Sequence, residues 1–133
     1  MKVKLELKGL EDYLERIVQA GNDVDEAAVA ALEAGSNVMV DGMQRRAPYD
    51  ESNFSEPHLR DALKKSEVHS DGSYHWVEVG LVDADGPMMR KAMANEFGTS
   101  SMSAQPYIRP TIAEDKAKII AAEKEVLQSR GMM

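Results

Sequence analysis

The residues of this sequence best suited to hold a metal ion are its three histidines, His58, His69 and His75. Their spacing does not place two of them on one face of a helix, and the last two flank a predicted turn. Two imidazoles across a hairpin fall short of the three or four ligands that protein zinc sites use. The chain has no cysteine, which excludes thiolate ligands, thiolate nucleophiles and disulfides. We therefore predict no metal site and interpret the histidines as surface residues of strands and turns.

The other patterns that resemble reactive sites are incomplete. Asp83 and Asp85 resemble the start of a calcium loop, but the twelfth position, which needs a bidentate Glu, is Ala94. None of the serines lies in a Gly-x-Ser-x-Gly elbow. The run Gly98-Thr99-Ser100-Ser101 lacks the Gly-Lys-Ser/Thr ending of a phosphate-binding loop. We therefore predict no catalytic residue, no cofactor and no enzymatic activity.

The charge of the chain argues against wrapping of nucleic acid. The net charge is −7, whereas each contact to a DNA phosphate uses Lys or Arg. Arg45-Arg46 and Lys64-Lys65 are adjacent cations at or near the C-terminal end of a predicted helix, where the helix dipole favours positive charge. Arg90-Lys91 is a further adjacent pair. The composition is compatible with DNA that passes through a channel, because an acidic wall repels the duplex.

Hydropathy predicts neither a membrane span nor a secretory signal. No stretch of eighteen or more apolar residues occurs, although a transmembrane helix needs about 20. The first six residues alternate charged and apolar side chains, unlike the unbroken apolar run of a signal peptide. We therefore expect a protein that is made and kept in the cytosol, or assembled there, and has no membrane partner.

The periodicity of the apolar residues predicts a single α+β domain over residues 1–133. Its expected core is a small antiparallel sheet with a β-hairpin, packed against two or three helices that include a long central helix and a C-terminal helix. Alternation predicts strands, and i, i+3, i+4 spacing predicts helices. The expected strands are residues 2–8 and the hairpin 67–81, which turns at Asp71-Gly72; the expected helices are 10–20, 24–46, 58–65, 87–97 and 110–131.

Three of these helices have a specific predicted orientation. In the helix over 24–46, capped by Asp23 and ended by Pro48, the inward face is rich in Ala and Gly, which favours close approach of another element. In the helix over 87–97, Met89, Ala92, Met93 and Phe97 are expected to point inward. The last helix is expected to bury an apolar stripe: Ile112, Ala113, Ile119, Ile120, Ala122, Val126 and Leu127.

The segment 94–110 resembles the signature of a family of tailed-phage minor tail components that act in head–tail joining, as neck or tail-completion proteins. In that family, a helix ends in Glu-Phe-Gly-Thr, a short loop with Met follows, and Ala-Gln-Pro, an aromatic, an aliphatic residue, Arg and Pro complete the pattern. The matching residues are Glu96, Phe97, Gly98, Thr99, Met102, Gln105, Pro106, Tyr107, Arg109 and Pro110.

Further residues agree with this resemblance. Gly9-Leu10 follows the first strand, Ala47-Pro48 ends the second helix, and Leu59-Arg60-Asp61 begins the next one, as is typical of the family. Two departures are the loop over 49–58, which is longer and lacks Gly, and Thr111, where the family usually has Ala. The resemblance spans most of the chain, but only the segment 94–110 is specific.

The residue types in the segment 94–110 also predict a structural role that does not depend on the resemblance. Gly98 lets the backbone turn after the helix, and Pro106 and Pro110 stiffen the path into the last helix. Glu96 and Arg109 are expected to form an ion pair that joins the two ends of the loop.

The resemblance implies a structural virion-assembly protein that acts by docking. It implies a ring, commonly sixfold, between the head connector or stopper and the tail tube or tail terminator, with DNA passing through. Its place would be the virion, assembled in the cytoplasm of the host bacterium. We expect the contacts to come from the loop 48–57, the loop 99–105 and the hairpin near Asp71.

Two alternatives remain open from the sequence. One is a related structural role, as tail terminator or as stopper below the portal. The other is a small dimeric cytosolic α+β binding domain, which an apolar pocket with convergent polar groups would favour.

Overall fold

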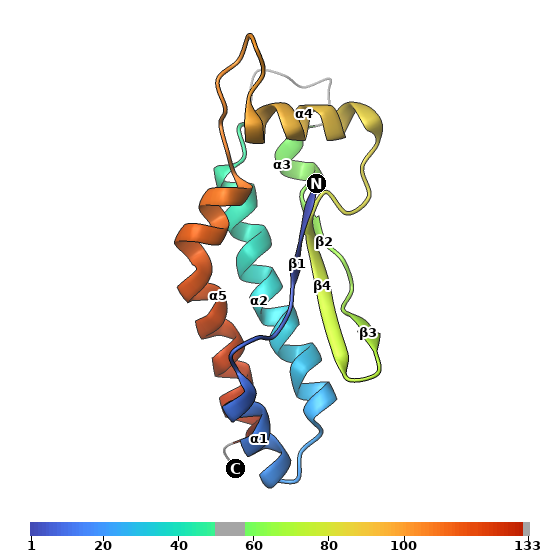
Figure 1. Cartoon of the computed structure of the whole chain (residues 1–133), viewed down its shortest axis with the longest axis vertical. Helices are drawn as coiled ribbons and strands as arrows, with labels where there is room; N and C mark the ends of the chain where they lie inside the picture. Colours follow the sequence, from blue (N-terminus) through green and yellow to red (C-terminus); the bar gives the residue numbers. More distant parts are fainter. Residues whose placement is uncertain (50–57, 132–133) are drawn as a thin grey trace.

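A computed structural model describes residues 1–49 and 58–131, which form one α+β domain (Figure 1). The elements in chain order are β1 (Lys2–Leu5), α1 (Glu11–Gln19), α2 (Val24–Arg46), α3 (Leu59–Ala62), β2 (Lys64–Lys65), β3 (His69–Asp71), β4 (Tyr74–Gly80), α4 (Gly86–Phe97) and α5 (Ile108–Gly131). The predicted fold class is confirmed: a small antiparallel sheet packs against the long central helix α2, and the C-terminal helix α5 packs alongside α2. None of the helices in the described part of the chain is long and apolar enough to cross a membrane.

The sheet is built around β4, which pairs antiparallel with β1 on one side and with β2 and β3 on the other. Val77 and Val79 are buried and lie opposite Leu5 and Val3, so that all four apolar side chains share one face. This face joins the main core with Leu32, Met39 and Met43 of α2. The alternation in the sequence therefore sets both the register of the sheet and the side that α2 covers.

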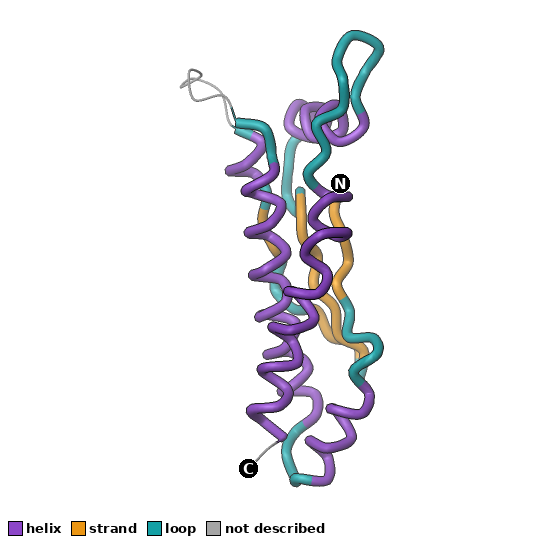
Figure 2. Tube along the Cα trace, turned by 90° about the vertical axis from the view of Figure 1, so that its left-hand side faces the viewer, coloured by secondary structure: helices purple, strands orange, loops and turns teal. Residues whose placement is uncertain are grey.

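Helices α2 and α5 run antiparallel and form the longest contact of the molecule (Figures 1 and 2). Helix α2 offers a face of small side chains, as its sequence predicts. Helix α5 buries every fourth residue against that face, and these residues are Thr111, Asp115, Ile119, Glu123 and Leu127. The predicted stripe of α5 is therefore partly wrong, since Ile112 is 41% exposed and two carboxylates are buried.

The first buried carboxylate, Asp115, pairs with the end of α2. Nη1 of Arg46 lies 2.7 Å from its Oδ2, and Nη2 lies 3.0 Å from its Oδ1, which is a bidentate arrangement. These hydrogen bonds hold the pKa of Asp115 below its ordinary value although burial opposes the shift. A Cβ atom at Gly42 would overlap Oδ2 of Asp115. Glycine at this position therefore makes the room that the ion pair occupies.

The second buried carboxylate, Glu123, lies over a second glycine two turns away. A Cβ atom at Gly35 would lie 2.8 Å from its Oε1. Glu123 is 3% exposed, and no hydrogen bond or ion pair from residues 1–49 or 58–131 reaches its side chain. Burial raises its pKa to about 7. Near neutral pH this carboxyl is therefore partly protonated in the folded chain.

Several predicted boundaries differ from the structure. Residues 64–65 are strand β2 and not helix, because Lys64 and Lys65 pair with Gly80 and Val79 of β4. The first strand ends at Leu5, where its pairing with Val77 ends. The hairpin turns at residues 72–73, one position later than predicted, because Asp71 pairs with Tyr74. Helix α5 begins at Ile108, two residues before the predicted start.

Replacement of Gly42 by Ala tests the close approach of α2 and α5. We expect Gly42→Ala to lower the free energy of unfolding by about 1–3 kcal/mol, because the new methyl group displaces Asp115 or its arginine partner. The loss should appear although Ala is the better helix former by about 1 kcal/mol. The measurement is urea unfolding at pH 7.

The matched control is Gly86→Ala at the start of α4, where the nearest atom to the new Cβ would be 3.5 Å away. This variant should be as stable as the wild type or slightly more stable. If Gly42→Ala and Gly86→Ala were equally stable, the packing of α2 against α5 would not require glycine at position 42.

Replacement of Glu123 by Gln tests the buried carboxyl. The pKa of Glu123 is raised on folding from 4.5 to about 7, so the folded chain binds the proton more tightly than the unfolded chain. Wild-type stability should fall as the pH rises from about 4.5 through 7, by up to about 3 kcal/mol from this group. Glu123→Gln should remove that slope and exceed the wild type in stability at pH 8. A parallel pH dependence of the two proteins would exclude this role for Glu123.

Candidate functional site

Glu96, in the last turn of α4, binds the first backbone amides of α5. Its Oε1 accepts from the N–H of Tyr107 at 3.0 Å and of Ile108 at 2.8 Å, and its Oε2 accepts from the N–H of Arg109 at 3.2 Å. The next residue, Pro110, has no N–H to satisfy. One side chain from another helix thus takes the place of the N-terminal cap that a helix normally carries in its own sequence.

Arg109 completes this contact from the other side. Its Nε lies 3.0 Å from Oε2 of Glu96, and its Nη2 donates to the backbone oxygen of Glu96 at 2.7 Å. The predicted ion pair between Glu96 and Arg109 is therefore confirmed. Burial alone would raise the pKa of Glu96, but the hydrogen bonds from Ile108, Tyr107 and Arg109 outweigh it and lower the pKa below its ordinary value.

The segment between Glu96 and Tyr107 leaves α4 and projects beyond the end of the molecule (Figures 1 and 2). Gly98 has a φ of 78°, and a Cβ there would lie 3.0 Å from backbone atoms of the returning chain. The N–H of Thr99 donates to the oxygen of Met102 at 2.8 Å, which closes a tight turn. On the return, the N–H of Gln105 donates to the oxygen of Asn95 at 2.7 Å. The loop 99–105 is therefore a hydrogen-bonded projection with Met102 exposed on it.

Tyr107 anchors the return of this loop in the core. The residue is fully buried, and its hydroxyl donates to the backbone oxygen of Ala92 at 3.2 Å. Burial raises the pKa of this phenol, followed by the charge of Glu96. Pro106 precedes it, and Pro110 lies in the first turn of α5, where proline is favoured. The signature residues thus divide into three groups: buried anchors (Glu96, Tyr107), half-buried residues (Gly98, Pro106, Pro110) and exposed residues (Phe97, Thr99, Met102, Gln105, Arg109).

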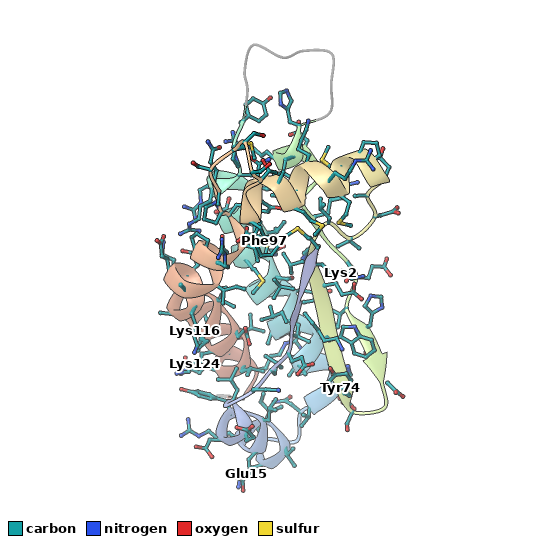
Figure 3. All side chains as sticks on the ribbon, turned by 45° about the horizontal axis from the view of Figure 1, so that its top comes forward. Lys2, Glu15, Tyr74, Phe97, Lys116 and Lys124 are labelled. Atoms are coloured by element: carbon teal, nitrogen blue, oxygen red, sulfur yellow. The ribbon has the colours of Figure 1, made fainter. Side chains whose placement is uncertain are left out.

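The orientation of α4 differs from the predicted one. Its buried residues are Met88, Ala92 and Glu96, whereas Met93 is 48% exposed and Phe97 is 60% exposed. Because Glu96 must point at α5, the helix is rotated, and Met93 and Phe97 point to solvent. The guanidinium of Arg109 lies 5.6 Å from the centre of the Phe97 ring. Figure 3 shows Phe97 at the surface beside the start of α5.

The other predicted contact segments are only partly described. The hairpin turn at Asp71 is exposed, as expected for a contact element. Of the loop 48–57, positions 50–57 lie outside the described residues. Of the hairpin histidines, His75 has partners within the chain: its Nδ1 lies 2.7 Å from the Ser70 hydroxyl, and its Nε2 lies 2.8 Å from Oδ1 of Asp25. Within residues 1–49 and 58–131, no group of three His, Asp or Glu residues is placed to hold a metal ion.

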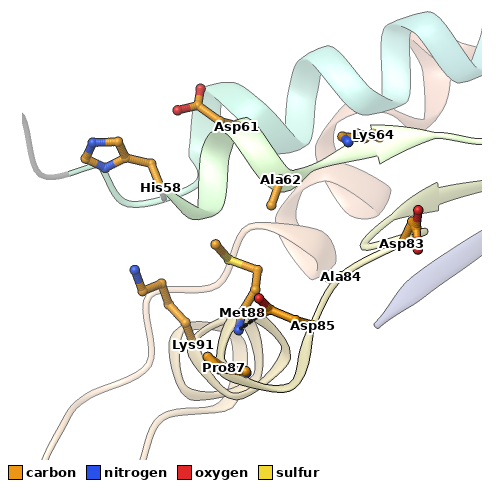
Figure 4. A pocket seen from close by; sticks show the side chains of 10 residues that line it. All are labelled: His58, Asp61, Ala62, Lys64, Asp83, Ala84, Asp85, Pro87, Met88 and Lys91. Atoms are coloured by element: carbon orange, nitrogen blue, oxygen red, sulfur yellow. Dashed lines mark hydrogen bonds between the residues drawn. The ribbon is translucent and has the colours of Figure 1, made fainter. Parts of the chain in front are cut away.

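A hollow of about 510 Å³ lies between α3, the turn before α4, and α4 itself (Figure 4). Asp85, which lines it, accepts from the N–H of Met88 at 2.9 Å and is the N-terminal cap of α4. Asp61, Asp83, Lys64 and Lys91 are the other charged residues of its lining. The carboxylate of Asp85 thus has a structural partner in the backbone N–H of Met88.

Comparison with known proteins gives one family. Residues 8–81 match a family described as "Bacteriophage HK97-gp10, putative tail-component". The match covers more than half of the chain, from the residue before Gly9 to Leu81, and ends before the segment 94–110. No curated protein and no solved structure matches the chain.

Replacement of Glu96 by Gln tests the cap of α5. Glu96→Gln places an NH2 group against backbone donors and removes the charge opposite Arg109, so we expect a loss of about 2–4 kcal/mol in the free energy of unfolding at pH 7. Because folding lowers the pKa of Glu96, its contribution is present above the unfolded-state pKa of 4.5 and is lost as the pH falls through the lower folded value. The gap between the two proteins should therefore narrow below about pH 4.5.

The matched control is Glu125→Gln, on the exposed side of α5. It should unfold like the wild type at every pH. If Glu96→Gln were as stable as this control at pH 7, the carboxylate would not be the cap of α5.

Proposed function

The chain belongs to the HK97-gp10-like family of bacteriophage tail components, and from this premise we propose that it is a structural neck protein. In this role it joins the head connector of a tailed phage or prophage to the tail and completes the virion. It acts by docking and carries out no catalysis.

The observation that carries this proposal is the anchored projection formed by the loop 99–105. The loop has no charged residue, exposes Met102, and is fixed at both ends by the buried contacts of Glu96. A loop that is ordered before binding loses less conformational entropy when it docks. Methionine adapts well to the surface of a partner. These features suit a protein contact and offer no group for catalysis.

The proposed assembly is a ring of identical copies, six by analogy with the neck role, with DNA passing through its centre. The ring would lie between the connector or stopper and the tail tube or tail terminator. It would be assembled in the host cytoplasm and remain in the virion. The negative net charge of the chain agrees with a channel that does not retain DNA.

Removal of the gene from its phage or prophage tests the proposal. We expect DNA-filled heads and complete tails to accumulate separately, as seen by negative-stain electron microscopy of the lysate. Addition of the purified protein should join them and restore the infectious titre by several orders of magnitude. Normal virions without the protein, or the absence of tails, would contradict a joining role.

Two variants make the same experiment specific for the loop. Met102→Asp should fold normally and restore at least tenfold less titre, because it puts a charge at the centre of the docking projection. Glu125→Lys, an exposed change on α5, should restore the titre like the wild type.

A further inference from the structure

Helix α4 presents a basic face with a large apolar centre. Arg90, Met93 and Phe97 are exposed at positions i, i+3 and i+7, and Arg109 lies against the ring of Phe97. Between residues 86 and 113 the only carboxylate is Glu96, which is buried. An exposed Phe and Met beside Arg is the composition of protein contact sites. We call Arg90, Met93 and Phe97 the α4 face.

Helix α1 presents the opposite kind of surface at the other end of the molecule. Glu11, Glu15 and Val18 are exposed at positions i, i+4 and i+7, and Val18 is 59% exposed. Residues 10–26 contain six carboxylates and one arginine. Glu15 has no ion-pair partner among the described residues of its own chain. We call Glu11, Glu15 and Val18 the α1 face.

The two faces are complementary in charge, and each has an apolar residue at the end of its stripe. They lie at opposite ends of the long axis, with α4 at one end and α1 at the other (Figure 1), and Figure 3 shows Phe97 and Glu15 far apart. They are too distant to meet within one chain, so only another molecule can cover either of them.

We propose that the α4 face of one copy packs against the α1 face of a second copy. The inference rests on the proposed function, because it names the contact through which copies of the ring join. Arg90 lies against Glu11 and Glu15, and Phe97 and Met93 cover Val18. Since the two faces differ, the contact is head-to-tail, and each copy can hold one neighbour at each end. Such a contact closes into a ring when each step adds a suitable rotation.

Two variants, each defective in one face, test this contact. Phe97→Asp destroys the α4 face, and Val18→Lys destroys the α1 face; both positions are exposed, so the fold should be kept. By sedimentation over a concentration series, the wild type should assemble, and each variant should associate at least tenfold more weakly. A mixture of the two variants should form a 1:1 dimer and nothing larger, because only one intact pair of faces remains.

The controls separate this contact from loss of fold and from other ligands. Glu125→Lys should assemble like the wild type, and all variants should share its circular dichroism and melting temperature. A wild type that stays monomeric, variants that assemble normally, or a mixture that stays monomeric would each overturn the contact. Duplex DNA that binds the α4 face, lost in Arg90→Glu while assembly is unchanged, would overturn it as well.

A failure of the α4–α1 contact can be distinguished from a failure of the proposed joining function. If Phe97→Asp and Val18→Lys assemble like the wild type and still join heads to tails, the joining function stands and the α4–α1 contact falls. If the wild type assembles through these faces but does not join heads to tails, the contact stands and the proposed function falls.

Discussion

The arrangement of α4, α5 and the loop between them depends on one contact, which joins the carboxylate of Glu96 to the first backbone amides of α5. Helix α5 begins without a Ser, Thr, Asp or Asn cap of its own, and its first amides would be buried without partners. Glu96 supplies the acceptor from α4, and Arg109 neutralises its charge. Because the two helices are joined in this way, the chain between them has both ends fixed.

This contact also decides which side chains α4 shows to solvent. With Glu96 and Ala92 turned inward, the residues one position away on the helix, Met93 and Phe97, must lie outside. The exposed apolar surface of Met93 and Phe97 is thus a geometric consequence of the hydrogen bonds between Glu96 and α5. Glu96 therefore has two effects: it stabilises the contact between α4 and α5, and it determines which side chains of α4 are exposed for docking.

The sequence predicts the bounds and pairing of helices and strands better than it predicts which face of each helix is buried. The bounds of α2 follow from the Asp23 cap and from Pro48, and the sheet register follows from the alternation at Val3, Leu5, Val77 and Val79. The pair of Glu96 and Arg109 is predictable from their positions on either side of a loop. The buried faces of α4 and α5 are not, because apolar spacing carries no information on a carboxylate that finds its partners in a distant helix. For α5 the missing signal was in α2, where Gly35 and Gly42 open spaces for Glu123 and Asp115.

The two glycines and two carboxylates make the seam between α2 and α5 selective for one alignment. Most of the α2 face consists of similar small side chains. A helix with only apolar residues on its buried face could therefore pack at several positions along α2 with nearly equal energy. A slide of α5 by one turn, about 5.4 Å, would move Asp115 away from Gly42 and Arg46 and towards Val38, leaving a buried charge without a partner. Misaligned packings are therefore penalised, so that the seam sets the position of α5, and with it Glu96, along the molecule.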